Sequence, residues 1–330
     1  MLVGLTYDLR SEYLAQGYSL EQTAEFDKID TINSIDNALT RLGYETLRIG
    51  NIKQLVSFLH SGKSCDLVFN IAEGMFGLAR EAQVPALLDA YEIPYVFSDA
   101  LVLAAALHKG IAKTIVRAHG VPTADFLVIE NVSDLKNITI PAPWFIKPAG
   151  GGTGIGINAS SMVHNLSDLQ IRAGRLLHEY GQPVLAESFL AGPEYTVGIV
   201  GTGNAARSIG VLTVEVVSEA DQGVYSYQSK QDYKDSVKYT LSVDPRITEA
   251  CNETALSAWR ALGCRDGGRV DLKYDNNGQV NFLEVNPLAG LHPIDSDLPI
   301  ICNQQGMEYV ELIKSIMDSA VSRIPQTVCT

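Results

Sequence analysis

Four polar side chains of complementary chemistry share one face of a predicted β-hairpin in the last third of the sequence. Residues 269–286 read RVDLKYDNNGQVNFLEVN, and Asn277-Gly278 between two β-like runs is the strongest short hairpin signal a sequence offers. With these two residues as the turn, the ionic face pairs Asp271 with Glu284 and Arg269 with Asn286. The opposite face pairs Val270 with Val285 and Leu272 with Leu283. The sequence therefore predicts one apolar and one ionic face.

The ionic face has the ligands of a magnesium site. Directly opposed Cβ atoms lie about 4.5–5.5 Å apart, so the carboxylates of Asp271 and Glu284 repel each other unless a cation lies between them. Carboxylate and amide oxygens suit Mg²⁺, which keeps waters and substrate phosphates as further ligands. We predict Asp271, Glu284 and Asn286 as metal ligands, and Arg269 as a fixed cation for an oxyanion or phosphate. A solvated face of mixed charge is the alternative, and the four aliphatic residues opposite argue against it.

A glycine-rich loop follows a predicted strand in the middle of the chain. The segment Lys147–Gly156 reads KPAGGGTGIG and holds five glycines, whose backbone N–H groups can approach phosphate oxygens closely. It has neither the spacing of a G-x-G-x-x-G motif nor that of a P-loop, and a flexible turn is the alternative interpretation. The lysine at its start and the metal-binding face downstream favour a phosphate site, for which we predict Gly151, Gly152 and Gly154.

Strands and helices alternate in the first hundred residues. Four β-like runs lie at 2–6, 46–49, 66–70 and 95–97. Between the first two, apolar residues recur at helical spacing from Phe26 to Leu42, and Ser19 with Gln22 forms a capping-box pattern that would start this helix earlier. Such alternation predicts an α/β domain with a doubly wound parallel sheet over residues 1–100.

The remainder of the chain predicts a mixed architecture, α+β in its C-terminal half. Helical patterns lie at 99–107, 109–118, 166–178, 248–262 and 308–321, and β-like runs at 126–129, 144–147, 184–187, 195–200 and 208–217. We predict a central subdomain at 101–190 and a C-terminal subdomain at 191–330 that carries the metal and catalytic site. The polar segment Ser218–Lys238 is our candidate for a lid over this site, with a surface excursion as the alternative.

Composition excludes several classes of protein. Acidic residues outnumber basic ones by 38 to 25, a net charge of −13, so the chain lacks the basic surface of a nucleic-acid-binding protein and is repelled by anionic membranes. No apolar run approaches the ~18 residues of a membrane span, and the N-terminus has no signal-peptide pattern. Five widely spaced cysteines without C-x-x-C fit free thiols. We therefore expect a cytoplasmic protein that binds neither nucleic acid nor membrane.

Several segments together resemble the ATP-grasp superfamily and, within it, the D-alanine–D-alanine ligases. They are VFNIAEGMFG at 68–77, QVPALL at 83–88, IPY at 93–95, the helix at 109–122, LAESFL at 185–190, EYTV at 194–197 and the hairpin with its continuation to Gly290. Each is weak alone, but jointly they are specific and cover nearly the whole chain. The resemblance implies an ATP-grasp architecture with the nucleotide between the central and C-terminal subdomains, and it implies a homodimer.

The resemblance also implies roles for individual residues. For ATP, it implies Lys109, Lys147 and Lys230 at the phosphates, Glu187 and Leu190 at the adenine, and Glu194 at the ribose. For the metal, it implies two Mg²⁺ ions on the three predicted ligands, with Mn²⁺ as an alternative. For catalysis, it implies Arg269 and the backbone of Gly290 at a tetrahedral oxyanion, with Lys230 in the lid and with Thr153, which retains the hydroxyl of a family serine.

The region expected to bind amino acids departs from the family pattern. The early glycine-rich signature with its ammonium-binding glutamate is absent; Asp8 or Glu12 could replace that glutamate, and a loop carboxylate is the alternative for each. The family's H-G-x-x-G-E-D-G reads EGMFGLAR at 73–80, so Glu73 either binds an ammonium group or pairs with Arg80.

The C-terminal substrate loop differs as well. His292, close to Gly290, has no counterpart in the family, and a structural donor is the alternative to a substrate-binding role. Ser296 lies three residues before Pro299, where the family has a carboxylate-binding serine. The catalytic residues are thus present, whereas the specificity pocket is rebuilt.

These residues predict an ATP-dependent, ADP-forming carboxylate–amine ligase that joins two amino acids. ATP phosphorylates a carboxylate to an acyl phosphate, which an amine then attacks. No protein nucleophile is needed, in agreement with the lack of a Ser-His-Asp or Cys-His pattern. The alternatives are a ligase of the same fold for other amino acids or small peptides, a small-molecule kinase of this fold, and a nucleotide-binding protein without catalysis.

Overall fold

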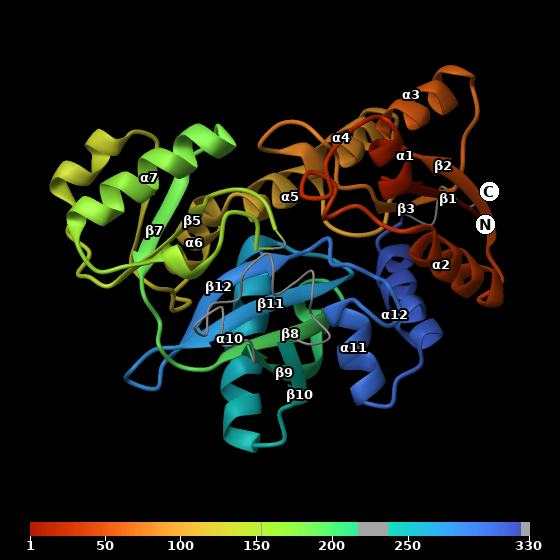
Figure 1. Cartoon of the computed structure of the whole chain (residues 1–330). Coiled ribbons are helices and arrows are strands. Elements are labelled where there is room, and N and C mark those ends of the chain that lie inside the picture. Colours follow the sequence, from red (N-terminus) through yellow and green to blue (C-terminus); the bar gives the residue numbers. More distant parts are fainter. Residues whose placement is uncertain (153, 217–236, 325–330) are drawn as a thin grey trace.

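The first of three β-sheets is parallel and lies near the N-terminus (Figure 1). The computed structural model describes residues 1–152, 154–216 and 237–324. In the order β2-β1-β3, the strands of this sheet are β1 (Leu2–Tyr7), β2 (Glu45–Gly50) and β3 (Leu67–Ile71). The helices around it are α1 (Arg10–Ala15), α2 (Ile29–Arg41), α3 (Ile52–His60) and α4 (Gln83–Ala90), with the 3-10 turn η1 (Arg80–Ala82). Separate apolar clusters, one including α2 and one including α3 and α4, cover the two faces, so the predicted doubly wound sheet is confirmed.

Two predictions for this region are wrong. Residues 95–97 form no strand, because only Tyr95 makes a parallel bridge to Val68. The helix does not begin near Ser19 either: Ser19 and Gln22 exchange both capping hydrogen bonds, at 2.9 and 3.1 Å, but these close a turn, and α2 starts at Ile29. The reason is that Arg10 binds the carbonyl oxygens of residues 23 and 24, which a helix would need for itself.

The second sheet is antiparallel and has the order β4-β7-β5-β6. Its strands are β4 (Phe126–Ile129), β5 (Trp144–Pro148), β6 (Met162–Val163) and β7 (Val184–Ser188). The elements beside it are α5 (Ala100–Leu107), α6 (Lys109–Ala118), α7 (Leu166–Tyr180), η2 (Val132–Asn137) and η3 (Ala159–Ser161). The predicted strands and helices of this region are confirmed to within two residues.

The third sheet is antiparallel with the order β10-β9-β8-β11-β12. Its strands are β8 (Glu194–Val200), β9 (Arg207–Val216), β10 (Val237–Leu241), β11 (Gly267–Tyr274) and β12 (Val280–Asn286). The short turn η4 (Gly203–Ala205) precedes β9. One face packs on α10 (Pro245–Leu262) through Trp259, which is fully buried.

The last two helices of the described chain pack the C-terminal region against the N-terminal sheet. Helix α11 (Asp297–Gln304) was not predicted, and α12 (Tyr309–Ser322) lies within two residues of the predicted helix at 308–321. Helix α12 packs against α2, so a single apolar cluster joins the first sheet to the C-terminal helices (Figure 1). Among the described residues, no helix is long and apolar enough to span a membrane.

Candidate active site

The hairpin of β11 and β12 presents the predicted ionic face, but its turn is wider than predicted. Arg269 lies opposite Asn286 and Asp271 opposite Glu284, as expected. A bulge follows Asp271, so Leu272 pairs with Phe282 and not with Leu283.

The turn is wider because of Asp275, whose side chain the prediction of a two-residue turn did not take into account. The side chain of Asp275 accepts backbone hydrogen bonds from Asn277 (2.8 Å) and Gln279 (2.9 Å), and this stabilises a turn from Asp275 to Gln279. The bulge compensates for the longer turn. It puts Phe282 into the core, where Leu283 was predicted, and leaves Leu283 beside Glu284 at a cavity.

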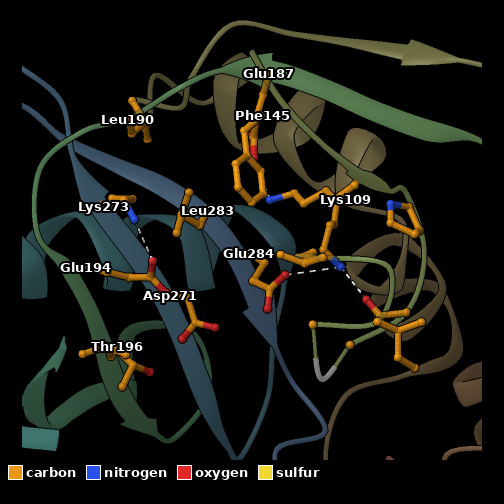
Figure 2. Close-up of a pocket in the computed structure, with 18 of the residues that line it drawn as sticks. Lys109, Phe145, Glu187, Leu190, Glu194, Thr196, Asp271, Lys273, Leu283 and Glu284 are labelled. Carbon is orange, nitrogen blue, oxygen red and sulfur yellow. Dashed lines mark hydrogen bonds and ion pairs between the residues drawn. The ribbon is translucent and has the colours of Figure 1, made fainter. Parts of the chain in front are cut away.

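This cavity, which we call the first cavity, lies between the second and third sheets. Figure 2 shows Phe145, Glu187 and Leu190 on one side and Glu194, Asp271 and Glu284 on the other. The predicted residues that line it are Lys109, Lys147, Gly151, Gly152, Gly154, Glu187, Leu190, Glu194, Arg269, Asp271 and Glu284. Sequence positions more than 170 residues apart are thus brought to one space, as an ATP-binding cleft between two subdomains requires.

Two buried lysines hold the carboxylate of Glu187. Lys147 Nζ lies 2.6 Å from Glu187 Oε1, and Lys113 Nζ lies 2.7 Å from Glu187 Oε2. Burial opposes the charge of Glu187, but the two ammonium groups outweigh it and lower its pKa to about 2. Burial also opposes the charge of Lys147, and Glu187 and Glu284 outweigh it, so the pKa of Lys147 is raised. For Lys113, burial dominates and lowers the pKa.

Lys113 is a residue of the site that sequence reasoning missed. Its side chain is fully buried and also donates to Thr123 Oγ1 (2.8 Å) and to the carbonyl oxygen of Phe282 (3.3 Å). It therefore ties α6 to β7 of the second sheet and to β12 of the third. Its position four residues after Lys109, on one face of a predicted helix, was the available signal.

Lys109 connects the glycine loop to the hairpin. Its Nζ donates to the carbonyl oxygen of Gly151 and lies 3.3 Å from Glu284 Oε2, the contact marked in Figure 2. Its backbone N–H donates to Ala149 at 2.8 Å. The lysine is nine-tenths buried, so its charge is held at the edge of the glycine loop.

Arg269 and Asp271 form a buried ion pair on the hairpin. Arg269 Nη1 donates to both Asp271 oxygens and lies 3.3 Å from Asp297 Oδ2, on the unpredicted helix α11. Asn286 Nδ2 donates to Asp271 Oδ2 at 3.2 Å. Burial raises the pKa of Asp271 to about 6, with Arg269 opposing the rise and Glu284 adding to it. Burial disfavours the charge of Arg269, but Asp271 and Asp297 outweigh it and raise the pKa of Arg269.

The hairpin residues fit a divalent cation by their chemistry. Asp271 and Glu284 are opposite each other, and the rise in the pKa of Asp271 that Glu284 contributes is the repulsion a cation relieves. Among the described residues, no group of three or more His, Cys, Asp and Glu could hold a metal. Two carboxylates and an amide, completed by phosphates and water, match Mg²⁺ rather than an all-protein metal cage.

The predicted ribose residue has a basic partner. Glu194 Oε2 accepts from Lys273 Nζ at 3.0 Å, and both residues line the first cavity beside Thr196 (Figure 2). Lys273 was not predicted, although its place two residues after Asp271 puts it on the same face of β11.

A second cavity continues from the first toward the N-terminal sheet. Lys109, Arg269 and Glu284 line both cavities. The predicted substrate residues Glu73, His292 and Ser296 all line the second cavity, together with Gly290 and Asn286. Its volume is about 350 Å³, against about 110 Å³ for the first.

The loop after β12 is built around Ser296. Ser296 Oγ accepts from the N–H of His292 at 3.0 Å, and a Cβ at Gly290 would lie 2.7 Å from this oxygen, so the close packing requires glycine. The Nδ1 atom of His292 accepts from the N–H of Asp295 at 3.0 Å. Because Nδ1 is the acceptor, the neutral imidazole carries its proton on Nε2.

The two alternatives for the N-terminal acid are not at the cavity. Asp8 is buried, bonds Tyr13 and accepts from the N–H of Gly74 at 2.8 Å, and neither Asp8 nor Glu12 lines the second cavity. Arg80 does not pair with Glu73 but binds Glu25, whose other oxygen accepts from the N–H of Gly152 at 2.7 Å.

Three predictions fall wholly or mostly outside the described residues. Thr153, Lys230 and positions 218–236 of the predicted lid are not described, and Val237 and Lys238 belong to β10.

Comparisons with known proteins agree with this geometry. A sequence model described as "D-ala D-ala ligase C-terminus" matches residues 115–318. The D-alanine–D-alanine ligase of Methylacidiphilum infernorum (isolate V4) is 31% identical over 296 residues, which are 89% of this chain and 90% of that protein. The D-alanine–D-alanine ligase of Aquifex aeolicus (strain VF5) is 29% identical over 290 residues, 88% of this chain and 94% of that protein.

Solved structures show the same fold. The D-alanine–D-alanine ligase from Bacillus anthracis complexed with ATP superposes with a TM-score of 0.72 at 21% identity, over 98% of both chains. The VanG D-Ala:D-Ser ligase from Enterococcus faecalis gives 0.74 at 18% identity, over 97% of this chain and 99% of that chain. The predicted ATP-grasp architecture is therefore confirmed.

Proposed function

The chain belongs to the D-alanine–D-alanine ligase family and is an ATP-dependent amino-acid ligase, and we propose that its two cavities divide the reaction between them. The first cavity binds ATP, and the second binds the two amino acids. Lys109, Arg269 and Glu284, which line both, surround the point where the terminal phosphate meets the substrate carboxylate.

The reaction has two steps. The carboxylate of the first amino acid attacks the γ-phosphorus of ATP, which forms the acyl phosphate and releases ADP. The amine of the second amino acid then attacks the acyl carbon, loses a proton and expels inorganic phosphate. No covalent bond to the protein forms, so its residues act by positioning and by charge.

The nucleotide residues act as a clamp. We propose that Lys109, Lys147 and the N–H groups of the glycine loop bind the phosphates, that Leu190 and Glu187 lie at the adenine, and that Glu194 binds the ribose. The Glu187–Lys147 contact supports this, because it holds one lysine extended between the adenine end and the phosphate end. Lys230 and Thr153 are proposed to complete the phosphate site from the lid and the loop.

The hairpin holds the metal. We propose that Asp271, Glu284 and Asn286 hold Mg²⁺, which would neutralise charge on the transferred phosphoryl group. Arg269, fixed by Asp271 and Asp297, then presents its remaining N–H groups to the oxyanion that forms at the acyl carbon, with the N–H of Gly290 as second donor. Buried ion pairs keep these donors in place before substrate binds, so little reorganisation is needed.

The C-terminal loop orients the amino acids. We propose that His292, through Nε2–H, and Ser296 bind a substrate carboxylate. The shared hydrogen bonds of this loop support the proposal, because they fix the tautomer of His292 and the position of Ser296 together. From the family resemblance we also propose two Mg²⁺ ions, replaceable by Mn²⁺, a homodimer and a cytoplasmic location.

The observation that carries the proposal is the sharing of Lys109, Arg269 and Glu284 by two adjoining cavities. Phosphate release is measured with D- and L-amino acids, offered singly and in pairs, and products are identified by mass. A ligase releases phosphate and forms a dipeptide only when donor and acceptor are both present. A stable phosphorylated product without ligation identifies a kinase and contradicts the proposal.

A further inference from the structure

Two acidic side chains lie near each other on the N-terminal wall of the second cavity. Glu73 follows β3 and Glu81 lies in η1, and both line the cavity. Glu81 is 8% exposed, and the two carboxyl groups are close enough for the charge of Glu81 to raise the pKa of Glu73.

The basic groups nearby are used elsewhere. Arg80, between the two acids in sequence, binds Glu25, and Arg10 binds the carbonyl oxygens of residues 23 and 24. Within the described part of the chain, neither Glu73 nor Glu81 has a Lys, Arg or His nitrogen within 4.0 Å. Among the described residues no ion pair neutralises the two acids, and Arg80 and Lys109 lower the pKa of Glu81 only by longer-range attraction.

Such a pair is stable without ligand only if it keeps a proton. Burial raises the pKa of Glu81 to about 8, although Arg80 opposes the rise, and burial and Glu81 together raise that of Glu73. A cation that entered from the cavity would take the place of this proton and supply the donors that the two carboxylates lack.

We propose that the second cavity accepts an amino acid with a basic side chain, and that Glu73 and Glu81 bind its ammonium or guanidinium group. This rests on the proposed ligase function and extends it to a substrate class. Neither acid belongs to the family pattern, in which a histidine stands at the position of Glu73.

The charge of the wall favours a side-chain cation over an α-ammonium group alone. Asp27 lines the same cavity, and burial raises its pKa to about 7. Asp27, Glu73 and Glu81 thus bring three carboxyl groups to this wall, whereas Lys109 and Arg269, which also line the cavity, are paired with Glu284 and Asp271. An amino acid with a basic side chain brings two positive charges, and the larger volume of this cavity leaves room for the longer side chain.

The test compares acyl donors and acceptors of matched stereochemistry. Phosphate release is measured with alanine, glutamate, ornithine, lysine and arginine, each varied against a fixed saturating partner, to give kcat/KM. We expect at least a tenfold preference for a basic side chain over alanine. In Glu81→Gln and Glu73→Gln, this preference ratio should fall at least tenfold.

A binding measurement and a matched control complete the test. The shift in unfolding temperature on adding ornithine, in the presence of ADP and Mg²⁺, should shrink in Glu81→Gln. Glu253→Gln, on the exposed surface of α10, should keep both the shift and the ratio of the wild type.

The inference and the proposed function fail differently. Ligation of alanine at least as efficient as that of basic amino acids would overturn the inference and leave the ligase intact. An equal loss for alanine and ornithine in Glu81→Gln would show an α-ammonium site and would also overturn it. Absence of amino-acid-dependent phosphate release with every substrate would instead contradict the proposed function.

Discussion

At the scale of single residues, the proposed role of Glu284 as a metal ligand can be tested most directly. Glu284→Ala removes one of two opposed carboxylates, so activity should fall by more than the roughly 10–100-fold that the loss of an outer-shell metal partner costs. The measurement is phosphate release over a magnesium titration. Activity near that of the wild type at saturating Mg²⁺ would exclude Glu284 as a ligand.

Arg269 should act on turnover and not on nucleotide binding. Arg269→Ala removes the cation proposed to face the oxyanion, which corresponds to a loss of about 2.7–4 kcal/mol of transition-state stabilisation. We expect a matching fall in kcat and little change in the Kd of ATP, measured by calorimetry. Tenfold weaker ATP binding with unchanged kcat would place Arg269 at the nucleotide instead.

Residue types and spacing indicated the hairpin and the glycine loop, and the family resemblance added the other nucleotide and substrate residues. Apart from the alternatives Asp8 and Glu12, the predicted site residues that the structure describes line one of two adjoining cavities. Lys113 was missed although its spacing from Lys109 placed both on one helix face, and Asp297 was missed because an acid after a loop has no local signature. Their roles depend on contacts with Glu187 and Arg269, far away in sequence.

At the scale of elements, the buried charges of Lys113 on α6, Lys147 on β5 and Glu187 on β7 link stability to pH, and we call these three residues the charge ladder. Lys113→Met leaves Glu187 with one cation, so the free energy of unfolding should fall by about 3 kcal/mol, the lower end of the range for a broken buried pair, since Lys147 remains. Urea unfolding measures this. Lys113→Met with Glu187→Gln should recover part of the loss, and no recovery would show that Lys113 acts through packing only.

The pH dependence of this ladder has a definite sign. The pKa of Glu187 is about 2 in the folded protein, below its ordinary value of 4.5, so its contribution to stability is present above pH 4.5 and is lost as pH falls through 2. The acid decline of unfolding free energy should be shallower in Glu187→Gln than in the wild type. Equal slopes would contradict the proposed ionic role.

The contribution of Glu81 to stability should change with pH in the opposite direction to that of Glu187. Its pKa of about 8 lies above its ordinary value of 4.5, so its contribution is complete below pH 4.5 and is lost as pH rises through 8. Glu81→Gln should therefore gain stability relative to the wild type between pH 5 and pH 8, as thermal unfolding would show. A constant difference across this range would mean that the carboxyl group stays ionised.

Elements were predicted well where periodicity or a cap marked them, and less well where a side chain redirected the backbone. Asp275 widened the hairpin turn, and Arg10 took the carbonyl oxygens of the expected early helix. In both cases a side chain forms hydrogen bonds with nearby backbone groups that regular secondary structure would otherwise use. Residue propensities do not account for such bonds. The predicted pairs Asp271–Glu284 and Arg269–Asn286 were still correct, because the bulge restores the predicted register between the turn and Asp271.

At the scale of the whole molecule, Glu25 joins the N-terminal region to the glycine loop. Glu25→Ala removes acceptors from Gly152 and Arg80, and a hydrogen bond to a charged group is worth about 1.5–3 kcal/mol, of which the lower end is roughly a tenfold change in affinity. We expect faster hydrogen exchange at residues 150–156 and a roughly tenfold higher KM for ATP. Glu45→Ala, on the exposed edge of β2, is the control.

Helix α12 has a consequence for how the protein is made. Its apolar side chains complete the core beneath the first sheet, yet they leave the ribosome long after β1, β2 and β3. During synthesis, the apolar face that α12 covers stays exposed until residues 309–322 have left the ribosome. We therefore expect a chain that is cut before Tyr309 to leave this core open and to aggregate more readily than one that includes α12.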